Sequence, residues 1–343
     1  MRSRSAVLHE PQNMRIEDVE LPELGPDEIL IEVKACGLCV TDVKRYAGKI
    51  RIGNFPVIMG HEFSGKVVRT GDGARRFVQG DSVVVEPDAG CGTCYMCKIG
   101  KANLCNGDHR LYGLNRNGGY AEYCAATESD CYRIPQGVSY EAAALSEPVA
   151  CAIHAVDVAG ASSSSSVAIV GAGFMGLLIT QILKASKVGR VIVVELKKDR
   201  LQAAKAAGAD LAINSLEGDP IEETKEATDG RGADVVIEAV GNIRTMELAT
   251  KLARQGGKAV IFGVPPADSR LQINPFELLI NEQTITSSFC KPNTFERAIA
   301  ALQRGVVMTD RLITSKYALE DIAQAMDTAQ KAPEGFIKAI IHN

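Results

Sequence analysis

The sequence predicts an α/β protein in which a β-rich domain is joined to a doubly wound parallel sheet. The chain has 343 residues, more than one ordinary hydrophobic core accommodates, so two domains are expected. Up to about Ala142, short β-branched runs are separated by Gly and Pro, which is typical of strands and turns. After that point strand-like and helix-like segments alternate, as they do in a doubly wound sheet.

The elements follow in order along the chain. In the β-rich part, strands are predicted at residues 29–33, 65–69 and 82–85. The serine run Ser162–Ser166 has low complexity and predicts an exposed connector. The alternating part contains predicted strands at 167–170, 190–194, 234–238 and 258–262, with helices at 174–186 and 201–208. Amphipathic helices at 295–304 and 319–331 precede a last strand at 336–341, which is expected to return to the first domain.

Composition excludes two classes of partner. Lys and Arg together number 38 against 42 Asp and Glu, a net charge of −4, which disfavours nucleic-acid binding. The longest apolar stretch, Val167–Thr180, is interrupted by three glycines and is too short to span a bilayer. The N-terminal residues contain no apolar signal segment. We therefore expect a cytoplasmic protein that binds neither nucleic acid nor membrane.

A glycine-rich turn predicts a dinucleotide site. Gly171, Gly173 and Gly176 follow a predicted strand and open a predicted helix, with Phe174 and Met175 between them. The first glycine permits the tight turn, the second lets a pyrophosphate approach the backbone, and the third lets helix and strand pack closely. Glu195, at the end of the next strand, suits the adenosine ribose hydroxyls and repels a 2′-phosphate. Lys197, Lys198 and Arg200 follow it, but Glu195 favours NAD.

Four cysteines form a compact cluster. They lie within fifteen residues of one another, and three glycines nearby give the backbone freedom to wrap an ion: Cys91, Cys94, Cys97 and Cys105. Four thiolates complete the tetrahedral coordination of a structural zinc ion. An Fe–S cluster and paired disulfides are the alternatives, and zinc is favoured over both.

A second group of potential ligands is dispersed. It comprises Cys39 with Thr41 and Asp42, His61 with Glu62, and Glu147 before Pro148. A catalytic zinc ion needs about three protein ligands and one open position for water or substrate. Taken singly, each residue also has an ordinary structural explanation, such as a buried thiol, a core histidine or a surface acid.

Residues 60–74, Gly-His-Glu-Phe-Ser-Gly-Lys-Val-Val-Arg-Thr-Gly-Asp-Gly-Ala, resemble the signature of the zinc-containing medium-chain alcohol dehydrogenases. With the four-cysteine cluster and the glycine turn, the resemblance covers nearly the whole chain. It implies a GroES-like, partly open β-barrel catalytic domain at residues 1–148 and 290–343, with a structural zinc lobe at about 88–108. It also implies a Rossmann NAD-binding domain at residues 149–289.

The resemblance implies a role for each dispersed residue. Cys39 and His61 are expected to bind the catalytic zinc ion, with Glu62 or Glu147 as the third ligand. Asp42 is expected to orient His61, and Thr41 to begin the proton relay to solvent. Many relatives carry a histidine where this chain has Lys44, so the outer part of the relay stays open.

The cofactors implied are one catalytic zinc ion, one structural zinc ion and NAD. Beyond the glycine turn and Glu195, further cofactor contacts are expected from residues that follow the later strands: Arg200, Val240, Gly241, Gly263, Val264 and Phe289.

Substrate and assembly are also suggested by resemblance. Residues 112–123 resemble threonine and polyol dehydrogenases, and residues 273–289 resemble bacterial sugar-alcohol dehydrogenases. We favour a polyol or a cyclitol-like secondary alcohol. L-Threonine 3-dehydrogenase, another zinc alcohol dehydrogenase and a non-catalytic nucleotide-binding relative are the alternatives. The apolar segment 283–289 is expected to form an edge strand that pairs with another chain, giving a homo-oligomer, with a tetramer favoured over a dimer.

Overall fold

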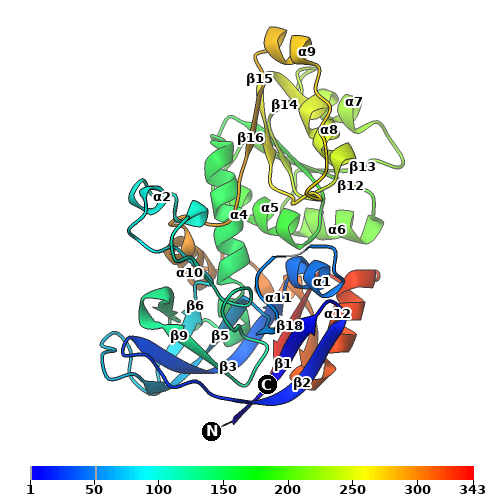
Figure 1. Cartoon of the computed structure of the whole chain (residues 1–343). Helices are drawn as coiled ribbons and strands as arrows, with labels where there is room; N and C mark the ends of the chain where they lie inside the picture. Colours follow the sequence, from blue (N-terminus) through cyan, green and yellow to red (C-terminus); the bar gives the residue numbers. More distant parts are fainter. Residues whose placement is uncertain (1, 51) are drawn as a thin grey trace. The chain divides into compact units, whose positions relative to one another are not determined.

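The computed structural model describes residues 2–50 and 52–343. The chain divides into two compact units, one made of Met1–Ala150 with Lys291–Asn343 and the other of Cys151–Cys290. Figure 1 gives the positions of the elements within each unit. Among the described residues, no helix is long and apolar enough to cross a membrane.

The first unit is built on a seven-stranded sheet of order β10-β6-β5-β3-β18-β17, with β9 also pairing with β3. A smaller sheet has the order β2-β1-β4. The strands of both sheets are β1 Arg2–Glu10, β2 Asn13–Glu20, β3 Glu28–Leu38, β4 Val57–Ile58, β5 Glu62–Thr70, β6 Ser82–Val85, β9 Tyr123–Thr127, β10 Cys131–Arg133, β17 Ile313–Ala318 and β18 Lys338–His342. The three strands predicted in this part of the chain lie in β3, β5 and β6, and are confirmed.

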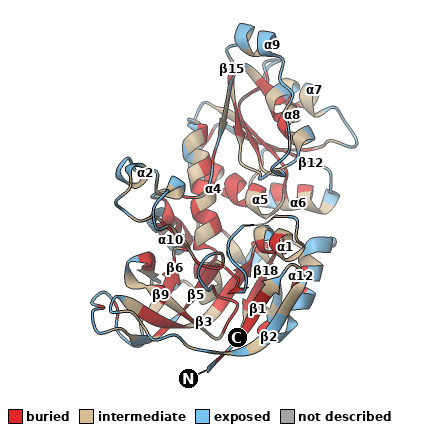
Figure 2. Ribbon diagram, viewed as in Figure 1, coloured by how far each residue is buried: buried red, intermediate tan, exposed pale blue. Residues whose placement is uncertain are grey.

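Strand β3 lies at the centre of this unit. Its residues Ile29, Ile31 and Val33 are buried together with Phe63 and Val67 of β5, because alternate side chains of each strand point to the same face. Figure 2 shows that buried residues follow these strands. The last strand, β18, pairs antiparallel with β3, so the C-terminal segment returns to the first domain as predicted.

The second unit is a six-stranded parallel sheet of order β13-β12-β11-β14-β15-β16. Its strands are β11 Ser166–Val170, β12 Arg190–Glu195, β13 Leu211–Asn214, β14 Ala233–Glu238, β15 Ala253–Ile261 and β16 Thr284–Ser287. Helices α5 Phe174–Ala185, α6 Lys198–Ala206 and α8 Ile243–Leu252 pack against these strands. Strand order reverses between β11 and β14, which defines a doubly wound sheet and confirms the predicted fold class.

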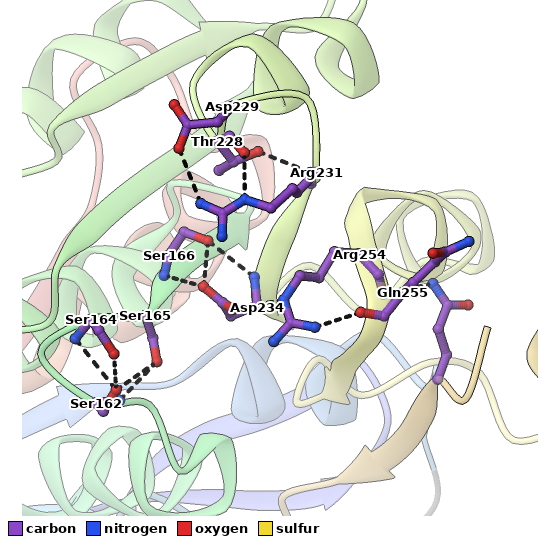
Figure 3. A network of polar contacts seen from close by, with 12 residues as sticks. Ser162, Ser164, Ser165, Ser166, Thr228, Asp229, Arg231, Asp234, Arg254 and Gln255 are labelled. Atoms are coloured by element: carbon purple, nitrogen blue, oxygen red, sulfur yellow. Dashed lines mark hydrogen bonds and ion pairs between the residues drawn. The ribbon is translucent and has the colours of Figure 1, made fainter.

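The serine run is only partly the exposed connector that the sequence predicts. Ser162, Ser163 and Ser164 are exposed, but Ser166 begins β11. Its backbone amide and hydroxyl donate hydrogen bonds of 2.7 and 2.8 Å to Asp234 of β14, which also accepts from Arg254 at 2.7 Å (Figure 3). The run ends in a strand because Asp234, a half-buried acceptor on the neighbouring strand, satisfies its last serine.

Candidate active site and cofactor site

Three potential metal ligands come together at the ends of two paired strands. Cys39 directly follows β3 and caps the N-terminus of helix α1 (Val40–Tyr46). His61 directly precedes β5, whose first residue is Glu62. Because Gly37 of β3 pairs with Glu62, these strand ends lie together. The Cys39 sulfur, a ring nitrogen of His61 and a carboxylate oxygen of Glu62 all lie within 4.8 Å of one another.

Two buried polar side chains, Asp42 and Tyr120, form a chain of contacts that ends at His61. Its Nδ1 lies 3.3 Å from Oδ1 of Asp42, and the hydroxyl of Tyr120 donates a hydrogen bond of 2.8 Å to Oδ2 of Asp42. Burial opposes ionisation of Asp42, but the charge and hydrogen bond of His61 and the bond from Tyr120 outweigh it and lower the pKa of this carboxyl. A carboxylate in this position fixes the imidazole and leaves its other nitrogen for a metal ion.

The donor set fits zinc. A thiolate, an imidazole and a carboxylate are ligands that Zn²⁺ takes in catalytic sites, where three protein ligands leave one coordination position open. The backbone amide of Thr41 lies 3.5 Å from the Cys39 sulfur and donates a hydrogen bond to it. Thr41 itself lies in the first turn of α1, beside the ligand group.

Glu62 is held by Lys338, a residue to which no motif in the sequence points. Nζ of Lys338, on β18, lies 2.7 Å from Oε1 and 2.6 Å from Oε2 of Glu62, and the two side chains are 3% and 1% exposed. Burial alone would lower the pKa of Lys338, but the carboxylate of Glu62 outweighs it and raises that pKa. The only signal in the sequence is a single charged residue inside the otherwise apolar strand at 336–341.

Glu147, the other predicted third ligand, lies outside the group formed by Cys39, His61 and Glu62. It lies in the first turn of α4 (Ser146–Ala159), close enough to Lys338 to contribute to the raised pKa of that residue. Space for the Glu62 carboxylate is provided by a glycine on β3, since any Cβ on Gly37 would overlap Oε2 of Glu62. The geometry therefore favours Glu62 over Glu147 as the carboxylate nearest the other two ligands.

The four-cysteine lobe has the spacing of a tetrahedral metal site. The sulfurs of Cys91, Cys94, Cys97 and Cys105 all lie within 4.8 Å of one another, and none of them forms a disulfide. The sulfurs of Cys94 and Cys105 are 3.8 Å apart. With Zn–S bonds of about 2.3 Å, sulfurs in a tetrahedral zinc site lie about 3.8 Å apart. The spacing of the four sulfurs therefore fits a closed zinc site.

Hydrogen bonds to the sulfurs prepare this lobe for metal. The hydroxyl of Thr93 donates to the Cys91 sulfur at 3.4 Å, and the amide of Cys94 donates to the same sulfur at 3.3 Å. Led by the contribution of Thr93, these bonds lower the pKa of Cys91 to about 5. The amides of Cys91 and Gly107 donate to the sulfur of Cys105. For Cys91 the donors stabilise the thiolate, which is the form that binds zinc.

The predicted glycine turn lies at the C-terminal end of β11. Gly171 has a φ of 102°, and a Cβ there would lie 2.5 Å from a methyl carbon of Val240. A Cβ on Gly176 would overlap the carbonyl oxygen of Gly171, so only glycine lets α5 approach the turn this closely. Phe174 and Met175 form the first turn of α5, and the N-terminus of a helix attracts phosphate.

Glu195 lies beneath this turn and is largely buried. Its Oε2 accepts a hydrogen bond of 2.9 Å from the amide of Ala172, and its Oε1 accepts from the amides of Leu196 and Lys197. Since a carboxylate offers about four acceptor positions, a hydroxyl can still be accepted. The guanidinium of Arg200 lies near Gly173: a Cβ added to Gly173 would lie 3.9 Å from a guanidinium nitrogen of Arg200.

The remaining predicted cofactor residues follow the later strands of the sheet. Val240 and Gly241 come after β14, and Gly263 and Val264 come after β15. A Cβ on Gly241 would lie 2.6 Å from the carbonyl oxygen of Val264, so the two turns pack directly on each other. Phe289 follows β16 and is exposed. These residues share the carboxyl edge of the sheet with the glycine turn, which is where doubly wound sheets bind ligands.

The fold and both clusters define a zinc-binding dehydrogenase. Residues 25–136 match the family of alcohol dehydrogenase GroES-like domains, and residues 175–304 match the zinc-binding dehydrogenases. The chain belongs to the zinc-containing medium-chain alcohol dehydrogenases, in their polyol dehydrogenase branch. The resemblance stated from the sequence is thereby confirmed.

Similar proteins support this assignment across the whole chain. A sorbitol dehydrogenase of Bacillus subtilis is 36% identical over 343 residues, 99% of this chain and 97% of that protein. A zinc-binding dehydrogenase of Sinorhizobium meliloti, solved with NADP, has a TM-score of 0.94 at 32% identity and covers 100% of both chains. A short-chain alcohol dehydrogenase of Escherichia coli CFT073, solved with NADH, has a TM-score of 0.93 at 28% identity and covers 100% of this chain and 99% of that one.

Proposed function

We propose that this chain oxidises a secondary hydroxyl of a polyol, using NAD as the hydride acceptor and one catalytic zinc ion. The observation that carries the proposal is the group of Cys39, His61 and Glu62, whose ligand atoms lie within 4.8 Å of one another. The polyol substrate is supported by the similarity to a sorbitol dehydrogenase. The NAD requirement is supported by the glycine turn and by Glu195 at the end of the next strand.

Each residue has a chemical task in this proposal. Cys39 and His61 hold the metal, with Glu62 as the third ligand. Zinc at such a site acts as a Lewis acid that lowers the pKa of an alcohol. NAD would accept the hydride that leaves the alcohol carbon, and the Thr41 hydroxyl would pass the hydroxyl proton on towards solvent. Asp42 keeps His61 in one orientation while Tyr120 holds Asp42 in place.

NADH formation across a panel of alcohols tests the proposal. The panel contains sorbitol, xylitol, arabitol, a cyclitol, L-threonine and ethanol, with zinc-loaded wild type and Cys39→Ser as the matched control. We expect kcat/KM to be highest for a polyol or the cyclitol and to collapse in Cys39→Ser. Highest activity with L-threonine would identify the alternative dehydrogenase. No turnover of any alcohol would support a non-catalytic, nucleotide-binding relative.

We predict that NAD is preferred over NADP. A 2′-phosphate placed beside the Glu195 carboxylate meets like-charge repulsion, and like charges about 4 Å apart cost roughly 1–4 kcal/mol. The preference in kcat/KM is therefore expected to be about tenfold or more, and Glu195→Gln should narrow it. Steady-state kinetics with both cofactors check this. Higher kcat/KM with NADP would mean that Lys197, Lys198 or Arg200 outweighs Glu195.

We predict a homo-oligomer, with a tetramer favoured over a dimer. Strand β16 lies at one edge of the parallel sheet and pairs only with β15 among the described strands. Helix α9 (Pro275–Ile280), which precedes it, exposes Phe276, Leu279 and Ile280. An unpaired strand and an apolar patch both favour two-fold pairing with a second chain. Light scattering measures the mass, and a stable monomer at micromolar concentration would contradict the prediction.

A further inference from the structure

A fully buried carboxylate lies at the carboxyl edge of the second unit and has no part in the chemistry described so far. Glu238 is the last residue of β14 and is 0% exposed. Its Oε1 accepts three hydrogen bonds, from the amides of Val240 and Gly241 at 2.9 and 2.8 Å and from the hydroxyl of Thr245 at 2.7 Å. Its Oε2 has no hydrogen-bond partner in the described part of the chain. Burying a carboxylate in this state costs stability, so its position requires an explanation.

The second oxygen faces the turn that follows β15. A Cβ on Gly263 would lie 2.7 Å from Oε2 of Glu238 and would overlap the amide nitrogen of Gly241. The amides of Phe262 and Gly263 donate to the carbonyl oxygen of Glu238 at 3.0 and 2.9 Å. One residue thus contacts both turns, 239–241 through its carboxylate and 262–264 through its backbone and Oε2. A bulkier side chain at Gly263 would break this packing.

The topology assigns these turns to one half of a dinucleotide. Strand order reverses between β11 and β14, and dinucleotides bind across the sheet at such a point. Glu195, suited to the adenosine ribose, ends β12 on one side of the glycine turn. Glu238 ends β14 on the other side, beside Val170 of β11. The turns held by Glu238 therefore belong to the nicotinamide half.

We propose that Glu238 is a positioning residue for the nicotinamide half of NAD. It fixes the relative position of the turns 239–241 and 262–264 and does not itself touch the reacting atoms. This inference rests on the proposed use of a nicotinamide cofactor. It predicts that weakening the contacts of Glu238 loosens the nicotinamide half of the site and leaves the adenosine half intact.

Two ligands separate the halves. NADH contains both, whereas ADP-ribose lacks the nicotinamide ring, and the Kd of each is measured by fluorescence and calorimetry. For Glu238→Gln we expect the Kd of NADH to rise about tenfold, because charge-assisted hydrogen bonds are lost, and the Kd of ADP-ribose to stay within about twofold. Thr245→Val removes the hydroxyl that contacts Glu238 and the carbonyl oxygen of Asn242 and keeps the carboxylate, so it tests the same idea in a variant that is easier to fold. It should raise the Kd of NADH about threefold.

Asp234→Asn is the matched control. Asp234 lies on the same strand at its other end, and it accepts hydrogen bonds from Ser166 and Arg254 (Figure 3). It should lower the unfolding midpoint without changing the ratio of the two Kd values. The inference is overturned if Glu238→Gln and Thr245→Val bind NADH as wild type does, or if NADH and ADP-ribose weaken equally. Wild-type protein that binds neither ligand would instead overturn the proposed function itself.

Discussion

Replacing Glu62 by alanine is expected to lower kcat by about 100-fold or more. Losing a residue that only hydrogen-bonds to a metal ligand already lowers metal affinity or activity by about 10- to 100-fold. The variant should also be less stable. It leaves the ammonium of Lys338, 3% exposed in the wild type, without its carboxylate. Breaking one side of a buried ion pair costs about 3–5 kcal/mol. Steady-state kinetics and denaturant unfolding measure the two effects separately.

A double variant separates catalysis from stability. Glu62→Gln with Lys338→Met removes both buried charges, and replacing a whole buried pair is often neutral for stability. We expect it to unfold near the wild-type midpoint and still to lack activity. Glu147→Ala should lower kcat less than Glu62→Ala, because Glu147 lies outside the ligand group. Full activity of both Glu62→Ala and Glu147→Ala would show that neither carboxylate is a ligand of the catalytic zinc ion.

Removing one ligand from the cysteine lobe is expected to unfold the lobe locally. The segment 88–108 has only short elements, β7 Asp88–Ala89, α2 Tyr95–Lys98 and a 3₁₀ turn at Ala102–Leu104, and Ala89 of β7 is the one buried residue among them. Metal binding in such small zinc lobes contributes on the order of 10 kcal/mol to folding. Cys97→Ser should therefore lose one zinc ion per chain and become sensitive to protease within the lobe.

Cys124→Ser is the matched control for the lobe. Cys124 is a buried thiol of β9 that belongs to neither group of potential metal ligands found among the described residues. It should keep the zinc content and protease resistance of the wild type. A Cys97→Ser protein with unchanged zinc content, measured by elemental analysis, would contradict a four-cysteine structural site.

What could be predicted from the sequence depended on how far apart the interacting residues lie. The four cysteines and the glycine turn are local, so their spacing alone indicated their chemistry. The strands were predictable because their side chains alternate or are uniformly buried. Lys338 pairs with Glu62 across 276 positions in the sequence, and nothing local to either residue indicates the partner.

The same reasoning explains what the sequence missed or left undecided. Ser166 was predicted as exposed because its neighbours are serines, yet Asp234, 68 residues later, draws it into β11. The choice between Glu62 and Glu147 could not be made from spacing, because it depends on how β3 and β5 pair. Glu238 gave no signal either, since an acid at the end of an apolar strand is usually solvated.

The most direct test of the account follows NADH formation from a polyol while the zinc content is varied. Mild chelation should leave one zinc ion per chain, in the closed Cys91–Cys105 site, because an open site exchanges its metal more readily. This form should be inactive, and adding zinc back should restore the rate in proportion to the second ion bound. Undiminished NADH formation at one zinc ion per chain, or a zinc content unchanged by Cys39→Ser, would contradict the account.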